Sequence, residues 1–138
     1  MQISKNFTWE EFTAFDTAKK LGILNQIIDW EVRDNVIALV ENLLQPLRDA
    51  WGKPITINSG YRCQKHNKNV GGAKNSRHTQ GMACDIVVKG VKPKEVAKFA
   101  ETIGIRGIGL YDTFVHIDSR ESKFYWKGHE QKSVKTFK

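Results

Sequence analysis

Cysteine is scarce in this chain, with two residues among 138. Two cysteines are too few for a disulfide scaffold, and we expect Cys63 and Cys84 to carry reduced thiols. Cys84 precedes Asp85 in a segment with strand character. Because successive side chains of a strand point to opposite faces, Cys84 should turn away from whatever Asp85 faces and pack as a small apolar residue.

Long hydrophobic runs are also missing. The longest apolar stretches span only a few residues, far short of the roughly 20 that a membrane-crossing helix needs. Residues 1–6 likewise lack the apolar region of a secretory signal. We therefore expect no membrane span. We expect a protein that either stays in the cytoplasm or leaves it by a route that reads no cleavable signal.

Acidic residues are outnumbered, with 15 Asp and Glu against 22 Lys and Arg, and the net charge is +7. A basic balance favours polyanionic partners such as nucleic acids or teichoic acids, and the sign alone does not choose among them. No helix-turn-helix or aromatic stacking motif is evident, so we expect no nucleic-acid partner. The basic C-terminal segment, 121–138, interleaves lysines with aromatic residues. It could contact a polymer, but we favour a solvated tail.

Repeats, low-complexity tracts and linkers are absent, and 138 residues suit a single domain over 1–138. Helical signals dominate the first half. A capping box at Thr8 and Glu11 predicts a short helix that begins at residue 8 and turns Phe15 inward. Apolar residues at helical spacing predict a long helix over 29–50, with a kink near Pro46.

Strand signals fall mainly in the second half. Strands are expected over 55–58, 82–88, 108–110 and 114–118, with a further helix over 93–103. Between the first two strands runs a polar, glycine-rich stretch, 59–81, with one helical turn near 63–68. A compact domain seldom keeps so long a loop without a functional reason. The predicted class is α+β, with N-terminal helices packed on a small, mainly antiparallel sheet that carries a metal site.

Histidine is limited to four residues, and two of them lie in segments that could hold a metal. His78 stands in the glycine-rich stretch, Asp85 follows seven residues later, and His116 lies on the last predicted strand. Zinc binds imidazole nitrogen and carboxylate oxygen, and a catalytic zinc site uses three protein ligands and leaves a fourth position for water. Spacing alone does not separate such a site from structural or exposed residues.

The residues around His78 carry a specific motif. Residues 76–85 read SRHTQGMACD and match the pattern S-x-H-x-x-G-x-A-x-D of the M15-type zinc D,D-peptidases. Further segments of the single-domain branch of that family resemble 7–12 (FTWEEF), 59–62 (SGYR) and 114–118 (FVHID). This family includes D-Ala-D-Ala carboxypeptidases and phage endolysins, and it shares its zinc-site fold with the hedgehog signalling domain. The resemblance covers about residues 7–120.

The resemblance implies roles for five residues. The zinc ligands of the family fall on His78, Asp85 and His116, which implies a Zn²⁺ cofactor. Its substrate-anchoring arginine falls on Arg62, whose planar guanidinium suits a peptide carboxylate or a developing oxyanion. The alternative for Arg62 is an ion pair with a nearby aspartate. Ser76 either positions the loop or hydrogen-bonds the substrate.

The general base is where this chain departs from the family. Many members carry H-x-H at the third ligand, and Phe114 occupies the first of those positions here. Others place an acidic residue three positions before the ligand, where this chain has Thr113. Asp118 is our first candidate. It would act as the base, or it would instead pair with Arg120 or orient a ligand histidine through its second ring nitrogen. Asp112, expected on the same strand face, is the second.

Four further residues stay outside the predicted site. His66 and His129 match no ligand position of the family, and we place both on the surface or in loops. Tyr125 and Trp126 could form a cleft wall or belong to the core.

The resemblance implies a zinc-dependent peptidase that hydrolyses D-amino-acid-containing peptide bonds of bacterial peptidoglycan. It leaves open a D,D-carboxypeptidase or an endopeptidase of the endolysin type. The alternative is a zinc-stabilised cell-wall-binding module without turnover, which the missing base favours. The expected partners are a peptidoglycan peptide and anionic cell-wall polymers, and we expect a monomer. The place of action would be the cytoplasm or, after release without a cleavable signal, the cell wall, as for a bacteriophage or prophage lysin.

Overall fold

A six-stranded sheet is the centre of the molecule. The computed structural model describes residues 1–13, 25, 27, 29–72 and 76–138. The sheet order is β3-β4-β6-β5-β7-β8. These strands are β3 (Ile55–Ser59), β4 (Ala83–Val88), β5 (Gly107–Leu110), β6 (Val115–Asp118), β7 (Phe124–Lys127) and β8 (Lys132–Val134). Neighbours are antiparallel except β5 and β7, which are parallel.

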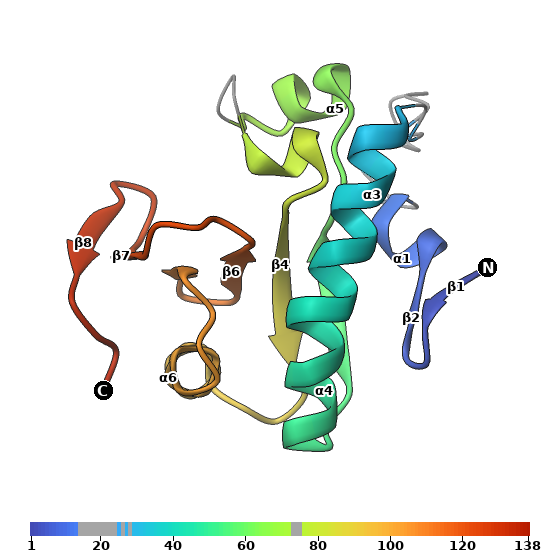
Figure 1. Cartoon of the computed structure of the whole chain (residues 1–138). Helices are drawn as coiled ribbons and strands as arrows, with labels where there is room; N and C mark the ends of the chain where they lie inside the picture. Colours follow the sequence, from blue (N-terminus) through green and yellow to red (C-terminus); the bar gives the residue numbers. More distant parts are fainter. Residues whose placement is uncertain (14–24, 26, 28, 73–75) are drawn as a thin grey trace.

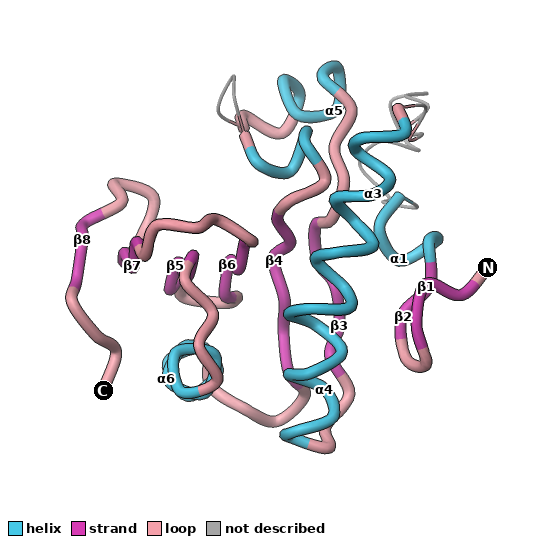
Figure 2. Tube along the Cα trace, in the orientation of Figure 1, coloured by secondary structure: helices cyan, strands magenta, loops and turns pink. Residues whose placement is uncertain are grey.

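A small hairpin of β1 (Gln2–Ser4) and β2 (Phe7–Thr8) lies at the N-terminus. The helices are α1 (Trp9–Thr13), α3 (Trp30–Leu39), η1 (Val40–Leu44), α4 (Gln45–Trp51), α5 (Gln64–Asn69), η2 (Arg77–Gln80) and α6 (Pro93–Thr102). Figures 1 and 2 show α3 and α4 as one long rod, with α6 beside β5 and β6. The mixed α+β class predicted from the sequence is confirmed. Among the described residues, no helix combines the length and hydrophobicity needed to cross a bilayer.

The capping box predicted at the N-terminus is confirmed. The Thr8 N–H donates to Glu11 Oε1 at 2.9 Å, and the Glu11 N–H donates to Thr8 Oγ1 at 3.4 Å. These reciprocal bonds satisfy two of the backbone donors that a helix leaves unpaired at its start, and α1 begins at Trp9. Phe12 of this helix is buried in the core. Phe15, which we expected to point inward as well, lies outside the described residues.

The long helix predicted over 29–50 contains a π-helical stretch. Asp29 caps its start by accepting the Glu31 N–H at 2.8 Å. The widened turn η1 comes immediately before Pro46, which has no N–H to donate to the preceding turn. The disturbance predicted at Pro46 therefore takes this form. Gly52 ends the rod with φ +69°, a left-handed conformation that glycine adopts without steric cost.

The C-terminal segment is part of the sheet, and our preference for a solvated tail is wrong. The segment contains β7 and β8, the last two strands of the sheet. Tyr125 and Trp126 point to opposite faces of β7, yet both are buried, and Phe137 packs against the Tyr125 ring. Burial of three aromatic side chains outweighs the pull of the neighbouring lysines toward water, because each contributes a few kcal/mol.

The helix η2 precedes β4 in the chain and contacts α3. The Asn35 side chain of α3 donates to the Gln80 carbonyl of η2 at 2.9 Å. Gly81 then turns the chain into β4 with φ +73°, and a side chain there would collide with the Val32 carbonyl of α3. The long helix thus fixes the position of η2 relative to β4.

Candidate metal centre

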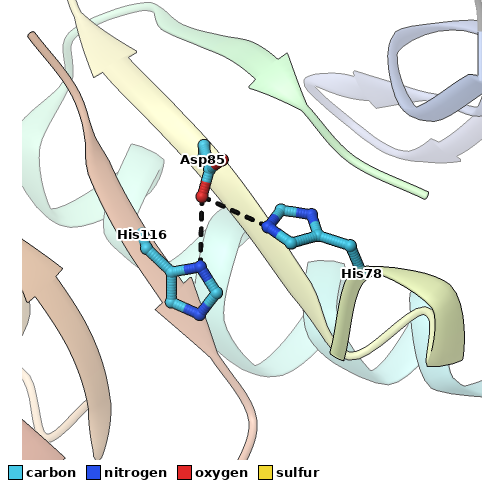
Figure 3. Close-up of side chains that lie close together, drawn as sticks. All are labelled: His78, Asp85 and His116. Atoms are coloured by element: carbon cyan, nitrogen blue, oxygen red, sulfur yellow. Dashed lines mark hydrogen bonds and ion pairs between the residues drawn. The ribbon is translucent and has the colours of Figure 1, made fainter. Parts of the chain in front are cut away.

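Two neighbouring strands bring Asp85 and His116 together. β4 and β6 are antiparallel, and their register sets Asp85 directly opposite His116, so the two side chains share one face of the sheet. His78 reaches them from η2, just before β4. Figure 3 shows the three side chains pointing toward one another. The residues predicted as ligands therefore meet at one place.

Each histidine presents one ring nitrogen to Asp85 and hydrogen-bonds through the other. His78 Nε2 lies 3.3 Å and His116 Nδ1 lies 3.1 Å from Asp85 Oδ1. His78 Nδ1 lies 2.8 Å from the Gly60 carbonyl oxygen. His116 Nε2 lies 2.8 Å from Asp118 Oδ2. The Gly60 carbonyl and the Asp118 carboxylate only accept hydrogen bonds, so a proton on each outer nitrogen suits them. With a metal bound, the inner nitrogens would then present their lone pairs to it.

The donor set fits zinc in spacing and in chemistry. The three donor atoms lie within 4.8 Å of one another. Atoms that bind a tetrahedral zinc at about 2.0–2.1 Å are about 3.3 Å apart. The two nitrogens lie 3.3 and 3.1 Å from Asp85 Oδ1, close to that value. Two imidazoles and one carboxylate are also ligand types that catalytic zinc sites use.

The electrostatic environment of the three side chains favours an ionised Asp85. Burial alone would raise the pKa of the Asp85 carboxyl, but hydrogen bonds with His116 and His78 hold it well below its usual range. Burial would lower the pKa of His116, yet the carboxylates of Asp118 and Asp85 raise it above its ordinary value. The site therefore stabilises negative charge on Asp85, as a metal ligand requires.

Asp118 is fully buried behind His116. Its Oδ1 accepts from Arg120 Nε at 2.8 Å, and its Oδ2 accepts from Arg120 Nη2 at 2.7 Å as well as from His116. Burial would raise the pKa of this carboxyl, but the bonds with Arg120 and His116 keep it well below its usual range. Both oxygens are engaged, so the geometry favours an orienting role over that of a base.

Arg62 lies beside the carboxylate on the opposite side from the histidines. Its Nη2 is 3.5 Å from Asp85 Oδ2, and its Nε donates to Ser59 Oγ at 2.9 Å. Its Nη1 donates to Asn67 Oδ1 at 3.2 Å. The ion pair that we had weighed against substrate anchoring is thus present. The two readings are compatible, because the same guanidinium lines the pocket described next.

The three predicted ligands line a pocket of about 410 Å³. Its wall also includes Arg62, Ser76, Tyr111, Phe114, Trp126 and His129. Of the described lining residues, Asp85 alone carries a carboxylate. Ser76 Oγ accepts the His78 N–H at 3.2 Å, which supports its role in positioning the loop. Asp112 is exposed and lines a neighbouring pocket instead.

The structure also places the four residues that were left outside the predicted site. Of the two aromatic residues for which both a cleft wall and the core were open, Trp126 lines the pocket, with its ring 5.1 Å from the His116 ring, and Tyr125 belongs to the core. His129 is exposed in the β7–β8 turn, as expected, but it too lines the pocket. His66 is 3% exposed within α5, so its expected place on the surface is wrong. No local sequence signal marks His129, because strand pairing brings it to the site.

The family model for peptidase M15 matches residues 5–118. This match contains the loop of His78 and both strands that carry Asp85 and His116. The chain belongs to the peptidase M15 family.

Two curated relatives of this M15 peptidase differ in the reaction that their names state. The zinc D-Ala-D-Ala carboxypeptidase of Streptomyces albus G is 57% identical over 44 residues, which are 31% of this chain and 17% of the relative. The peptidoglycan L,D-endopeptidase MepK of Escherichia coli K12 is 35% identical over 81 residues, which are 54% of this chain and 44% of the relative. The matches thus span less than half the length of these relatives.

Proposed function

We propose that this chain is a zinc-dependent peptidase that hydrolyses D-amino-acid-containing peptide bonds of bacterial peptidoglycan. The observation that carries the proposal is the convergence of His78 Nε2, Asp85 Oδ1 and His116 Nδ1 at the floor of a pocket. The family membership supports a peptidase. The name of the Escherichia coli relative supports peptidoglycan as the target, and that of the Streptomyces relative supports zinc and a D-alanine peptide bond.

His78, Asp85 and His116 would hold the metal. A bound zinc ion lowers the pKa of a coordinated water and polarises a carbonyl oxygen. The protein contributes orientation: the Gly60 carbonyl fixes the His78 ring, and Asp118 fixes the His116 ring. Because each ring is held through its outer nitrogen, the inner nitrogens need no rearrangement before they bind.

Arg62 supplies positive charge at the pocket wall. Its guanidinium is tied to Ser59 and Asn67, so it is held in one orientation beside Asp85. A peptide that enters the pocket brings a carbonyl oxygen that gains negative charge during hydrolysis, or a terminal carboxylate. Arg62 stabilises either group, and a fixed donor does so with little reorganisation.

The bond that is cut separates two versions of the proposal. A carboxypeptidase releases terminal D-alanine, whereas an endopeptidase releases larger stem-peptide fragments. The site of action would be the cell wall, as for a phage-type lysin, or the cytoplasm. Anionic wall polymers would be secondary partners of the basic surface.

Digestion of purified peptidoglycan tests the proposal, with product masses read by mass spectrometry. The samples are the wild type, the wild type with a chelator, and His78→Ala. We expect peptide fragments or D-alanine from the untreated wild type only, and the masses name the bond. Intact peptidoglycan in every sample, with zinc bound by the wild type, would overturn the peptidase proposal in favour of a non-catalytic wall-binding module.

A further inference from the structure

Hydrolysis of a peptide needs a group that takes a proton from the attacking water and gives it to the leaving nitrogen. Phe114 lines the pocket, and its phenyl ring cannot exchange a proton. Asp118 is buried with both oxygens engaged, and Asp112 lines a different pocket. Another side chain has to face the site.

Outside the three predicted ligands, one described lining residue is of a type that exchanges protons near neutral pH. This residue is His129, in the turn between β7 and β8. Its side chain is exposed, so a substrate can reach the imidazole. Arg62 shares the pocket wall but keeps its proton at all ordinary pH values.

The turn that carries His129 has a defined conformation. The Gly128 N–H donates to the Leu110 carbonyl at 2.9 Å, which ties the turn to the end of β5. The Gln131 N–H donates to the Gly128 carbonyl at 2.9 Å. Gln131 has φ +54°, and among the described residues it is the non-glycine with a left-handed backbone. Such a conformation costs about 1 kcal/mol or more and is often kept where function requires it.

Aromatic contacts connect this turn to the metal centre. The Tyr111 ring stacks on Phe114 at 4.5 Å and meets the His129 ring at 4.9 Å. Trp126 donates from Nε1 to the Tyr111 hydroxyl at 3.0 Å, and its ring lies 5.1 Å from the His116 ring. The Tyr111 ring thus contacts both Phe114 and the imidazole of His129, which the turn between β7 and β8 supplies.

We propose that His129 is the proton-transfer residue of this site, an inference that rests on the proposed peptidase function. One ring nitrogen takes a proton from water while the water oxygen bonds to the carbonyl carbon. As the carbon–nitrogen bond breaks, that proton passes to the leaving nitrogen and the neutral imidazole returns. One water is consumed, and a carboxyl group and an amine are released. Tyr111 positions His129 through their ring contact.

The test uses the full chain loaded with zinc and the muropeptide that the wild type cleaves. His129→Gln keeps a polar side chain but removes the base, and we expect kcat to fall about 100-fold or more with KM changed less than about threefold. Zinc per chain, counted by native mass spectrometry, should stay at the wild-type value. In His129→Gly, added imidazole should restore part of kcat. Glu130→Gln, in the same turn but outside the pocket wall, is the matched control and should keep wild-type kcat.

Three results would overturn the assignment. The first is a kcat for His129→Gln within about threefold of the wild type. The second is loss of bound zinc from this variant, because His129 would then act on the metal. The third is equal loss of kcat in Glu130→Gln, because the turn would then matter only for its shape. If the wild type cleaves nothing, the proposed peptidase function itself is wrong. If the wild type and His129→Gln are both fully active, only the role of His129 is wrong.

Discussion

Asp118 makes its contacts on the side of the His116 ring that faces away from Asp85. It accepts from His116 Nε2 through one oxygen and from Arg120 through both. Asn at this position has a single acceptor oxygen and a donor NH₂ group in place of the second. One of these contacts would become donor against donor, so the His116 ring would lose its fixed orientation.

We therefore expect Asp118→Asn to weaken zinc binding about 10- to 100-fold, the range typical when a carboxylate behind a ligand histidine is removed. Competition with a chromophoric chelator measures this affinity. Asp112→Asn is the control, because Asp112 lies in the neighbouring pocket and should leave zinc affinity unchanged. Wild-type zinc affinity in Asp118→Asn together with a collapse of kcat would instead identify Asp118 as the general base.

The sequence could single out three residues that the fold brings together, because their motifs are local. His78, Asp85 and His116 stand in short segments whose residues are neighbours in the chain. His129 could not be found in that way, since it reaches the pocket through the pairing of β5 with β7, two strands that are not consecutive in the chain. The sequence offered Arg120 as a partner of Asp118, and the structure shows that pair. The sequence could not show that Arg120 and His116 together engage both carboxylate oxygens, since that depends on the folded geometry.

At the scale of elements, Gly109 allows β5 to lie directly against Trp126 of β7. Gly109 lies in the strand beside β7, opposite Trp126 in the parallel register. A Cβ built at Gly109 would come 2.4 Å from Trp126 Cε2, far closer than two carbon atoms pack. The indole occupies the space of the absent side chain, and this contact holds Trp126 at the pocket wall.

Gly109→Ala should therefore lower the free energy of unfolding by about 1–3 kcal/mol, the usual cost of overpacking a core site. Urea denaturation of the variant measures this change. In the Gly109→Ala background, Trp126→Phe replaces the indole with a smaller ring and should recover part of the loss. Strictly additive effects of the two substitutions would show that the indole and the strand do not compete for this space.

Elements with local signals were predictable, and those that depend on long-range contacts were not. The capping box of Thr8 with Glu11 and the cap at Gly52 involve residues within one or two turns. The strands β7 and β8 were read as a tail because lysines interrupt them. The parallel pairing with β5 and the burial of Trp126 hold β7 in the sheet, and β8 pairs with β7.

At the scale of the whole molecule, positive charge gathers beside the metal pocket. Three lysines, Lys92, Lys94 and Lys127, line a pocket of about 570 Å³ that shares Tyr111 with the pocket of the metal centre. A net charge of +7 favours association with polyanions, and these lysines would hold such a chain next to the site.

Replacing these three lysines with glutamine should weaken retention on cell walls that carry teichoic acid, because the local charge beside the site is lost. Co-sedimentation at 50 and 200 mM salt measures retention, and we expect the wild type to lose much of it at the higher salt. A control variant replaces Lys5, Lys53 and Lys135 with glutamine, so both triple variants have a net charge of +4. Equal weakening in both would show that only net charge matters.

Zinc should stabilise the whole fold, because its three predicted ligands come from η2, β4 and β6 and exist as a set only when the chain is folded. At a free zinc concentration 100-fold above Kd, linkage adds about 2.7 kcal/mol, or a Tm increase of roughly 8 °C for a chain of this size. Differential scanning calorimetry of the metal-free protein with and without Zn²⁺ measures this shift. Mg²⁺, which prefers oxygen ligands, should leave Tm unchanged, and His78→Ala should abolish the response to zinc. A response to zinc that survives in His78→Ala would place the stabilising metal elsewhere, independently of any measurement of activity.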